Sequence, residues 1–285
     1  MYFDKTPLMK RSPDRPKACR HAAVCTMLLA LSCPVTWASD LAIPLELEQP
    51  NFAGVGVGAY PDYLGSDDAA LGVAPFARIS LGGERFVRVL ANEVRLNALD
   101  HPNWQLGPTA LLRFGRRNVD DQVVQRVHDI DRSLSMGLFG GYRWRDEEDA
   151  RRQAGTNAWS LWDASGTYNG WTAGINAFYM QPVARPLTLA AGLGMTYASD
   201  NYMNEYFGVT QQDAFNSGLP AYAAGAGARD VRGWVTGVFH LGPQWHLATG
   251  VLFARLLSDA ADSPIVSERG SENQWIYGAS LLYAW

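Results

Sequence analysis

Residues 275–285, at the C-terminal end of the chain, read WIYGASLLYAW. Every second residue from Trp275 to Trp285 is apolar, and aromatic residues lie at both ends of this set. A period of two predicts a β-strand that shows these side chains on one face. Aromatic rings on either side of small aliphatic side chains, over about ten residues, are typical of a strand that crosses a lipid bilayer. The stretch therefore favours the closing strand of an outer-membrane barrel over the edge strand of a soluble sandwich.

The same strand predicts how the chain reaches the membrane. A closing strand that ends on an aromatic residue suits recognition by the barrel assembly machinery, which we expect as a partner besides outer-membrane lipid. The residues expected to form this assembly signal lie on the face predicted to meet lipid: Tyr277, Leu281, Tyr283 and Trp285.

Residues 1–38 have the features of a secretory signal peptide. Six basic residues come before a short apolar run at residues 22–31, and Ala38 offers a small residue at a cleavage position. The apolar run is too short for a membrane-spanning helix, which needs about 20 residues. We therefore expect export and cleavage after Ala38. Residues 30–33, which end in Cys33, weakly resemble a lipobox and leave a lipoprotein leader as the alternative.

Composition limits the class of the mature protein. All three cysteines lie in the leader, so the mature chain can form no disulfide. Without the leader's six basic and two acidic residues, the 24 basic and 28 acidic residues fall to a net charge of −8, which argues against a nucleic-acid partner. Because no long apolar helix is predicted, the chain must cross a membrane as a closed sheet. We expect one domain, residues 39–285, with a short periplasmic lead-in at residues 39–50.

Alternation and turn residues predict an all-β, up-and-down antiparallel barrel of about twelve strands. The predicted strands are residues 52–60, 73–81, 85–90, 94–99, 104–114, 134–144, 158–164, 171–179, 187–197, one strand within 223–240, 245–253 and 275–285. An even count returns the C-terminus to the periplasm and places the long loops outside. The charged residues 145–152 are then a long periplasmic turn. Ten or fourteen strands stay open, because residues 85–99 divide into two strands only weakly.

The side of each strand that faces away from lipid carries arginine. If Val94, Leu112 and Leu138 face lipid, the opposite parity points five arginines into the lumen: Arg78, Arg88, Arg95, Arg113 and Arg143. A side of the lumen that is lined by these five arginines suggests a pathway or a site for anions. The alternative is that these arginines pair with water and with carboxylates, for which Glu84, Glu93 and Asp163 are candidates. Glycines of the same parity (Gly137, Gly141, Gly174, Gly192 and Gly194) either leave room for water or relieve crowding.

The predicted outer loops contain candidate contacts for a partner, because loops on rigid scaffolds carry function and aromatic residues anchor interfaces. These candidates are Tyr63, Tyr202, Tyr206, Phe207, Tyr222, Asp262, Ser263 and Pro264. The alternative is that the loops fold over the barrel mouth, pack on each other and occlude a pore.

Residues for catalysis or metal binding are sparse. His128 has acidic neighbours in Asp129 and Asp131, the company that a general base needs, but such pairs are common in polar loops. Ser263 lacks the Gly-x-Ser-x-Gly turn of a hydrolase nucleophile. Acidic residues in the long loops follow no calcium-loop spacing, and no Cys/His spacing suggests zinc. We therefore expect no enzyme, no cofactor and no metal.

Several short motifs are distinctive: YMNEYFGVT at 202–210, AADSPIV at 260–266 and the terminal YAW, with weaker ones at 54–56, 61–66, 75, 107–108 and 115–116. Together they resemble the motifs of the MipA/OmpV family, in which MipA stands for MltA-interacting protein. The resemblance covers residues 39–285, although Trp285 stands where the family usually has Phe. It implies an outer-membrane barrel and, for one member, a scaffold that joins a lytic transglycosylase to a murein synthase. For other members it implies roles in adhesion or in antibiotic and osmotic response. It implies no catalytic residues.

Three functions are then in competition. The first is a non-enzymatic outer-membrane scaffold linked to murein (peptidoglycan) remodelling enzymes and to envelope stress or antibiotic response. The second is a narrow channel for small, anionic solutes with an arginine-lined lumen. The third, a barrel enzyme, rests on His128 alone.

Overall fold

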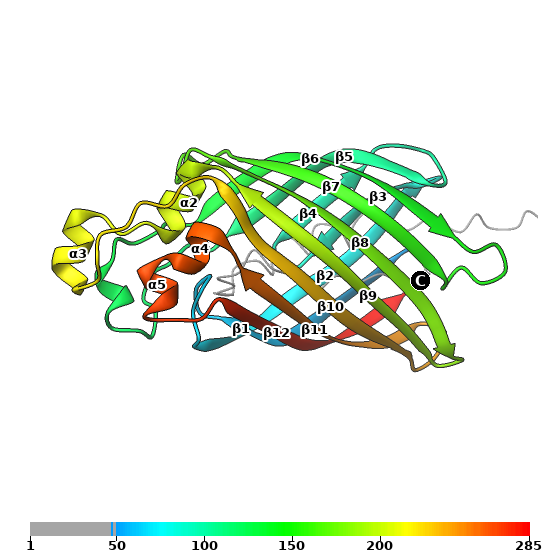
Figure 1. Ribbon diagram of the computed structural model, residues 1–285. Coiled ribbons are helices and arrows are strands. Elements are labelled where there is room, and N and C mark those ends of the chain that lie inside the picture. The colour runs from blue at the N-terminus through cyan, green and yellow to red at the C-terminus, as the bar shows by residue number, and fades with distance from the viewer. Residues whose placement is uncertain (1–46, 48–49) are drawn as a thin grey trace, which may run out of the picture. The chain divides into compact units, whose positions relative to one another are not determined.

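The computed structural model describes residue 47 and residues 50–285, and its strands form a closed antiparallel barrel (Figure 1). Neighbouring strands pair in chain order, and the first strand closes on the last. The strands are β1 (Phe52–Pro61), β2 (Ala69–Gly82), β3 (Arg85–Leu90), β4 (Glu93–Asn97), β5 (Trp104–Arg113), β6 (Ser133–Arg145), β7 (Gln153–Asp163), β8 (Trp171–Ala184), β9 (Leu187–Ala198), β10 (Gly227–His240), β11 (Trp245–Leu256) and β12 (Asn273–Ala284). The predicted fold and strand count are confirmed. The predicted leader and most of the predicted lead-in lie outside the described residues.

Some strands are longer than side-chain alternation predicts. β7 begins at Gln153 rather than at residue 158, because residues 153–157 pair with both β6 and β8 through their backbone. Backbone pairing needs no apolar side chain, so a polar stretch can extend a strand without leaving an apolar pattern. The division of residues 85–99 into β3 and β4 is confirmed.

The outer face of the barrel is apolar and has aromatic residues at both ends. Outward side chains in the middle of the wall are exposed, as Leu193 (71% exposed) and Ile175 (60%) show. Aromatic pairs lie near one end at Trp104–Tyr142 and Trp245–Tyr283, and near the other at Trp171–Tyr197 and Phe253–Trp275. An apolar band between two aromatic girdles is the surface of a barrel embedded in lipid. In the part of the chain that is described, no helix has both the length and the apolar character that a membrane crossing requires.

The two ends of the barrel differ. At the end with the C-terminus the strands are joined by the shorter turns, and we call this the turn end (Figure 1). The opposite, loop end carries the short helices η2 (Val124–Arg126), α2 (Asp200–Phe207), α3 (Gln211–Ser217), α4 (Ser258–Asp262) and α5 (Pro264–Ser267) (Figure 1). Outer-membrane barrels keep their longer loops outside the cell.

The helices of the loop end are absent from the strand prediction, although two of them carry a sequence signal. The Ser199 side chain caps α2 by accepting a hydrogen bond from the Tyr202 N–H. Thr210 and Asp213 form a reciprocal capping box at the start of α3. A Ser, or a Thr followed three residues later by an acidic residue, marks such helix starts. These helices have only three to eight residues, too few for periodicity to reveal them.

Inward glycines make room for large side chains. A Cβ placed on Gly192 would lie 2.6 Å from ring atoms of Trp234, and one on Gly174 would lie 2.6 Å from the Trp159 ring. Both distances are shorter than any van der Waals contact. Of the two interpretations of the inward glycines, relief of crowding is therefore the correct one at these positions.

Gly192→Ala is expected to lower the free energy of unfolding by about 1 to 3 kcal/mol, the usual effect of overpacking. The added methyl group would meet both the Trp234 ring and the Ala177 carbonyl oxygen. Urea unfolding of the barrel in lipid vesicles, followed by tryptophan fluorescence, measures the loss. Gly242→Ala is the matched control, because nothing lies within 4 Å of its Cβ position. Equal losses in the two variants would contradict the explanation.

Candidate functional site

The lumen contains a small cavity lined by arginine side chains. Six arginines from β3–β6 and β10 line it: Arg88, Arg95, Arg113, Arg143, Arg229 and Arg232. The cavity has a volume of about 120 Å³. Pockets that take drug-sized ligands measure about 300 to 1,000 Å³, so this cavity is small.

Four of the five arginines predicted to face inward lie on this cavity. The fifth, Arg78, is also buried but lies elsewhere, where its Nη1 donates to the Pro50 carbonyl oxygen at 2.7 Å. Its guanidinium also lies over the Phe86 ring, 4.3 Å from the centroid. Through this hydrogen bond, Arg78 holds Pro50, which lies two residues before β1.

In the part of the chain that the structure describes, two carboxylates pair with these arginines. One Glu93 carboxylate oxygen accepts a hydrogen bond from Arg95 Nη2 at 2.8 Å, and the other lies 2.6 Å from Arg95 Nε and 3.7 Å from Arg88 Nη2. Asp230 is fully buried and accepts hydrogen bonds from Arg229 Nε at 2.7 Å and from Arg232 Nη1 at 3.1 Å. Burial of several guanidiniums requires such partners, since a buried charge without a counter-charge costs several kcal/mol.

The three carboxylates that were candidates for pairing with the inward arginines have different partners in the structure. Glu93 pairs with inward arginines as expected. Glu84 pairs instead with Arg145, at 3.1 Å, near the turn end. The prediction for Asp163 is wrong, because its carboxylate accepts the backbone N–H groups of Tyr168 and Asn169 and so shapes the turn after β7.

Arg229, Asp230 and Arg232 were missed by the sequence analysis. Arg232 could have been found, because Val231 and Val235 face outward and place it on the opposite side of the strand. Arg229 could not, since the register of β10 against β9 shifts between Ala228 and Asp230. A β-bulge breaks the period of two, so both Arg229 and Asp230 are buried side by side.

The loop end of the lumen is closed by α2. Tyr202 is fully buried, with its ring 5.2 Å from the Arg113 guanidinium and 5.4 Å from that of Arg229. Its hydroxyl accepts a hydrogen bond from Arg229 Nη1 at 2.7 Å. Tyr206 stacks on Tyr202 at 4.4 Å. Contacts between an aromatic ring and guanidiniums are stabilising, and here they join α2 to two arginines that line the cavity.

The loops at this end pack on each other around an apolar cluster that draws on four segments. The cluster consists of Tyr63, Val119, Val124, Val127, Val209, Leu219 and Ile265. We call these packed loops and helices the cap. Of the predicted partner contacts, Tyr63, Tyr202, Tyr206, Phe207, Ser263 and Pro264 are buried, whereas Asp262 is exposed and Tyr222 is half-buried. The structure therefore matches the alternative interpretation, in which the loops close the mouth.

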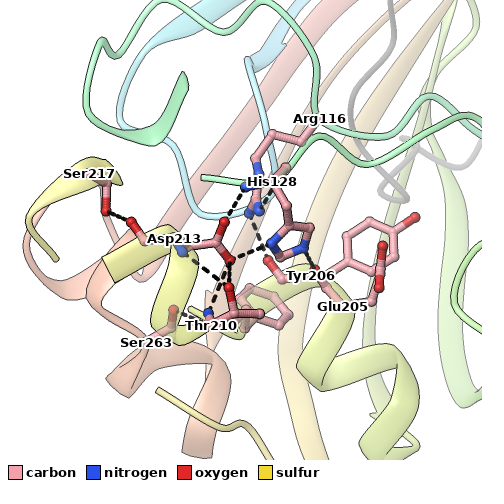
Figure 2. Close-up of polar contacts among 9 residues, drawn as sticks. Arg116, His128, Glu205, Tyr206, Thr210, Asp213, Ser217 and Ser263 are labelled. Atoms are coloured by element: carbon pink, nitrogen blue, oxygen red, sulfur yellow. Dashed lines mark hydrogen bonds and ion pairs between the residues drawn. The ribbon is translucent and has the colours of Figure 1, made fainter. Parts of the chain in front are cut away.

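A polar network ties the cap together (Figure 2). Arg116 is buried and donates to the carbonyl oxygens of Tyr206 at 3.0 Å and His128 at 3.4 Å. Asp213 accepts hydrogen bonds from the backbone N–H of His128 at 2.8 Å and from the Thr210 hydroxyl at 2.7 Å. The network thus joins the loop after β5 to α2 and α3. The Ser263 hydroxyl adds the last loop by donating to the Phe207 carbonyl oxygen at 2.6 Å.

His128 belongs to this network rather than to a catalytic site. Its Nδ1 lies 2.8 Å from an Asp213 carboxylate oxygen and its Nε2 lies 3.1 Å from the Glu205 carbonyl oxygen (Figure 2). The predicted neighbours, Asp129 and Asp131, pair with Arg117 instead. Because both ring nitrogens face acceptors, neither is placed to take a proton from a substrate. Among the residues that the structure describes, no group of three or more His, Cys, Asp or Glu could hold a metal ion.

The environment of the cap shifts several pKa values. Burial lowers the pKa of Arg116 to about 10, so its guanidinium stays charged at neutral pH. Burial raises the pKa of Glu205, and the nearby His128 partly opposes this shift. For Asp213, burial alone would raise the pKa, but hydrogen bonds from Thr210 and His128 outweigh it and hold the pKa at about 2.

The cap is therefore expected to open in acid. The pKa of Asp213 is lower in the folded cap than its usual 3.8. The charged carboxylate therefore stabilises the cap fully above pH 3.8, and this stabilisation is lost as the pH falls toward about 2. Proteolysis of the loops across a pH series, with an acid-tolerant protease, measures this opening. Glu205 acts in the opposite direction, since a raised pKa favours the protonated folded form. Asp213→Asn should remove the rise in loop proteolysis at low pH, and Glu205→Gln should not. An unchanged rise in Asp213→Asn would show that protonation of Asp213 does not open the cap.

The two remaining predicted features are the assembly signal, on β12 and at the C-terminus, and the charged turn. Tyr277, Leu281 and Trp285 are exposed on the outer face, and Tyr283 is half-buried between the rings of Trp245 and Trp285. Recognition of these residues by the assembly machinery stays a prediction. The charged residues 146–152 form the turn between β6 and β7, as expected.

Comparison with known proteins gives matches to outer-membrane proteins. A family model described as MltA-interacting protein MipA matches residues 53–285. Putative outer membrane protein YiaT of Escherichia coli K12 is 25% identical over 177 residues, which cover 60% of this chain and 66% of YiaT. Outer membrane protein OmpV of Vibrio cholerae is 33% identical over 114 residues, which cover 40% of this chain and 42% of OmpV. The matches thus span less than two thirds of these relatives.

Solved structures with a related shape are also outer-membrane proteins. The NanC porin has a TM-score of 0.46 and 10% identity, over 82% of this chain and 100% of that one. An outer membrane channel from Pseudomonas putida F1 has a TM-score of 0.44 and 12% identity, over 87% of this chain and 99% of that one.

Proposed function

The chain belongs to the family of the MltA-interacting protein MipA, whose relatives are outer-membrane proteins, and from this premise we propose that it is a non-enzymatic scaffold. In this role the barrel anchors a lytic transglycosylase of the MltA type, and with it a murein synthase, at the inner surface of the outer membrane. The observation that carries the proposal is the closure of the barrel. A cavity of only about 120 Å³ in the lumen, together with the packed cap, leaves the turn end as the working surface.

The turn between β6 and β7 is the best candidate for the docking surface. It places Glu147 and Glu148 in solvent, while Arg152–Asp146 and Arg151–Asp149 pairs hold its shape. Arg151 Nη1 also donates to the Arg185 carbonyl oxygen, which joins this turn to the one between β8 and β9. A rigid turn with exposed carboxylates suits a basic patch on a periplasmic enzyme.

The proposal is tested by binding between the detergent-solubilised barrel and a purified lytic transglycosylase of the MltA type. Glu147→Lys combined with Glu148→Lys is expected to weaken binding at least tenfold, because like charges would then face each other. Asp67→Lys combined with Asp68→Lys is the control, because these two exposed carboxylates lie in the loop between β1 and β2, at the loop end. Equal binding by all three proteins, or no binding by the unchanged barrel, would refute this scaffold.

A narrow anion channel is the second candidate, and the arginine wall is the observation that favours it. A channel should give unitary conductance in planar bilayers, and Arg88→Glu or Arg113→Glu should reduce or reverse its selectivity. The scaffold should give no conductance steps. Anion-selective steps from the unchanged barrel would therefore favour the channel.

A further inference from the structure

The outer face of the barrel carries an arginine where β6 begins at the loop end. Ser133 and Ser135, the first two inward residues of β6, are buried, whereas Leu134 between them is exposed on the outer face. Alternation along the strand therefore places Arg132, which is exposed, on the outer face with Leu134. Because Leu134 is the exposed apolar residue of β6 that is nearest to the loop end, Arg132 lies at the edge of the apolar band.

An aromatic ring supports the guanidinium of Arg132. Its Cζ lies 5.7 Å from the ring centroid of Phe114, which is half-buried just after β5. Leu112 of β5 pairs with Leu134 of β6, so Phe114 and Arg132 follow at the next outward positions of the two strands. A cation–π contact uses the charge of the guanidinium and not its N–H donors, which can therefore bind an anion at the same time.

The carboxylates nearest to Arg132 in the chain and in the sheet have other partners. Asp131, its neighbour in the sequence, lies 3.3 Å from Arg117 Nη1. Asp163, at the end of the adjacent strand β7, accepts backbone N–H groups of the turn that follows it. Among the described residues, no carboxylate forms an ion pair with Arg132. This exposed cation therefore meets its counter-charge in its surroundings.

Hydrogen bonds from the turn after β7 hold the backbone of this arginine. The Thr167 hydroxyl donates to the Arg132 carbonyl oxygen at 3.4 Å, and the Leu134 N–H donates to the Ser165 hydroxyl oxygen at 3.1 Å. The side chain is thus fixed at its base by the turn and near its tip by the Phe114 ring. A side chain that is already positioned loses less conformational freedom when it binds a ligand.

The surroundings of Arg132 are the headgroup layer of the membrane. Residues just beyond the apolar band of a membrane barrel lie in the polar interface of the bilayer, and long basic side chains extend their charged ends into it. A guanidinium matches a phosphate group with two parallel hydrogen bonds. The apolar side chains of Leu134 and Phe114 lie beside the guanidinium, so one lipid can place its phosphate on Arg132 and its acyl chains against the wall.

We propose that Arg132, supported by Phe114, binds the phosphate of a lipid headgroup in the outer leaflet. The charge of the guanidinium complements that of the phosphate, and the apolar wall beside it distinguishes a lipid from a dissolved anion. The proposal does not depend on the scaffold function, because it concerns the outer face of the barrel and needs no partner protein.

The first experiment measures which lipid lies beside Arg132. A fluorophore is attached to Leu134→Cys in a chain whose three native cysteines are replaced by serine, and the barrel is purified from outer membranes into phosphatidylcholine vesicles. Lipids with a nitroxide on the acyl chain quench the fluorophore when they lie next to it. Phosphatidic acid is expected to associate about fivefold more strongly than phosphatidylcholine at this position, the preference that one interfacial arginine provides. Equal quenching by the two lipids would overturn the proposal.

The second experiment tests whether Arg132 is the cause of this preference. Arg132→Gln is expected to abolish it, and Arg132→Lys, which keeps the charge, should retain most of it. Arg255→Gln is the matched control, because Arg255 is also exposed near the loop end but pairs with Glu272 at 2.6 Å. A preference that survives Arg132→Gln, or that falls equally in Arg255→Gln, would overturn the proposal. A changed mobility of unheated samples on gels verifies that each variant has folded.

A third measurement separates a lipid headgroup from a dissolved anion. Millimolar inorganic phosphate is added to the unchanged barrel in the same vesicles, and the preference for phosphatidic acid is expected to persist, because a free phosphate gains nothing from the apolar wall. Loss of the preference in inorganic phosphate would assign the site to a dissolved anion and would overturn the lipid assignment.

Discussion

Asp230→Asn is expected to lower the free energy of unfolding by about 3 to 5 kcal/mol, the usual cost of removing one partner from a buried ion pair. Asp230 is fully buried and accepts hydrogen bonds from both Arg229 and Arg232. Asparagine keeps the shape of the side chain but removes its charge and turns an N–H₂ group toward a guanidinium. The loss is therefore electrostatic and not a loss of packing.

The measurement is urea unfolding of the barrel in lipid vesicles, with tryptophan fluorescence as the signal. Glu272→Gln is the matched control, because Glu272 pairs with Arg255 at 2.6 Å but both side chains are largely exposed. Exposed pairs contribute about 0 to 1 kcal/mol, so the control should lose little. A similar loss in the two variants would mean that burial does not set the strength of the Asp230 interactions.

Asp213→Ala is expected to open the cap while the barrel stays folded. The Asp213 carboxylate accepts hydrogen bonds from the N–H and the hydroxyl of Thr210 and from the N–H of His128, and it contacts the His128 ring. Loss of the helix cap and of hydrogen bonds to a buried charge costs about 2 to 4 kcal/mol. This corresponds to a rise of roughly 30- to 700-fold in the opening equilibrium of the cap.

Amide hydrogen exchange measures this opening segment by segment. Residues 199–226 and the loop after β5 should exchange faster in Asp213→Ala, and the strands should not. Asp200→Ala is the control, since Asp200 is an exposed residue in the first turn of α2. Faster exchange in the strands as well would show that Asp213 supports the whole barrel and not the cap alone.

The barrel wall was predictable because lipid imposes a local rule on each strand. Outward residues such as Leu138 and Leu193 must be apolar, and this requirement also identifies the inward positions of Arg88, Arg95, Arg113 and Arg143. The rule fails where the backbone departs from regular pairing. The bulge at Arg229 therefore concealed one of the arginines that hold Tyr202.

The candidate site was less predictable, because its contacts join distant parts of the chain. His128 was noticed for its neighbours Asp129 and Asp131, yet its partner is Asp213, 85 positions away. The sequence identifies the aromatic residues of the outer loops, but it does not show that most of them are buried, because their contacts come from other loops. Tyr202 is buried because Arg113, Tyr168 and Arg229, all distant from it in the sequence, pack against its ring.

The amino-acid sequence by itself determined the barrel and the side of the wall on which each regular strand residue lies, whereas the structure decided between ten, twelve and fourteen strands. The sequence could do so because alternation against lipid is a property of neighbouring residues in one strand. Only the tertiary structure decided that the outer loops pack on each other and which of the described carboxylates meet the arginines. Those contacts exist only after the sheet has curled into a cylinder and brought β1 against β12, since no local pattern links residues that far apart.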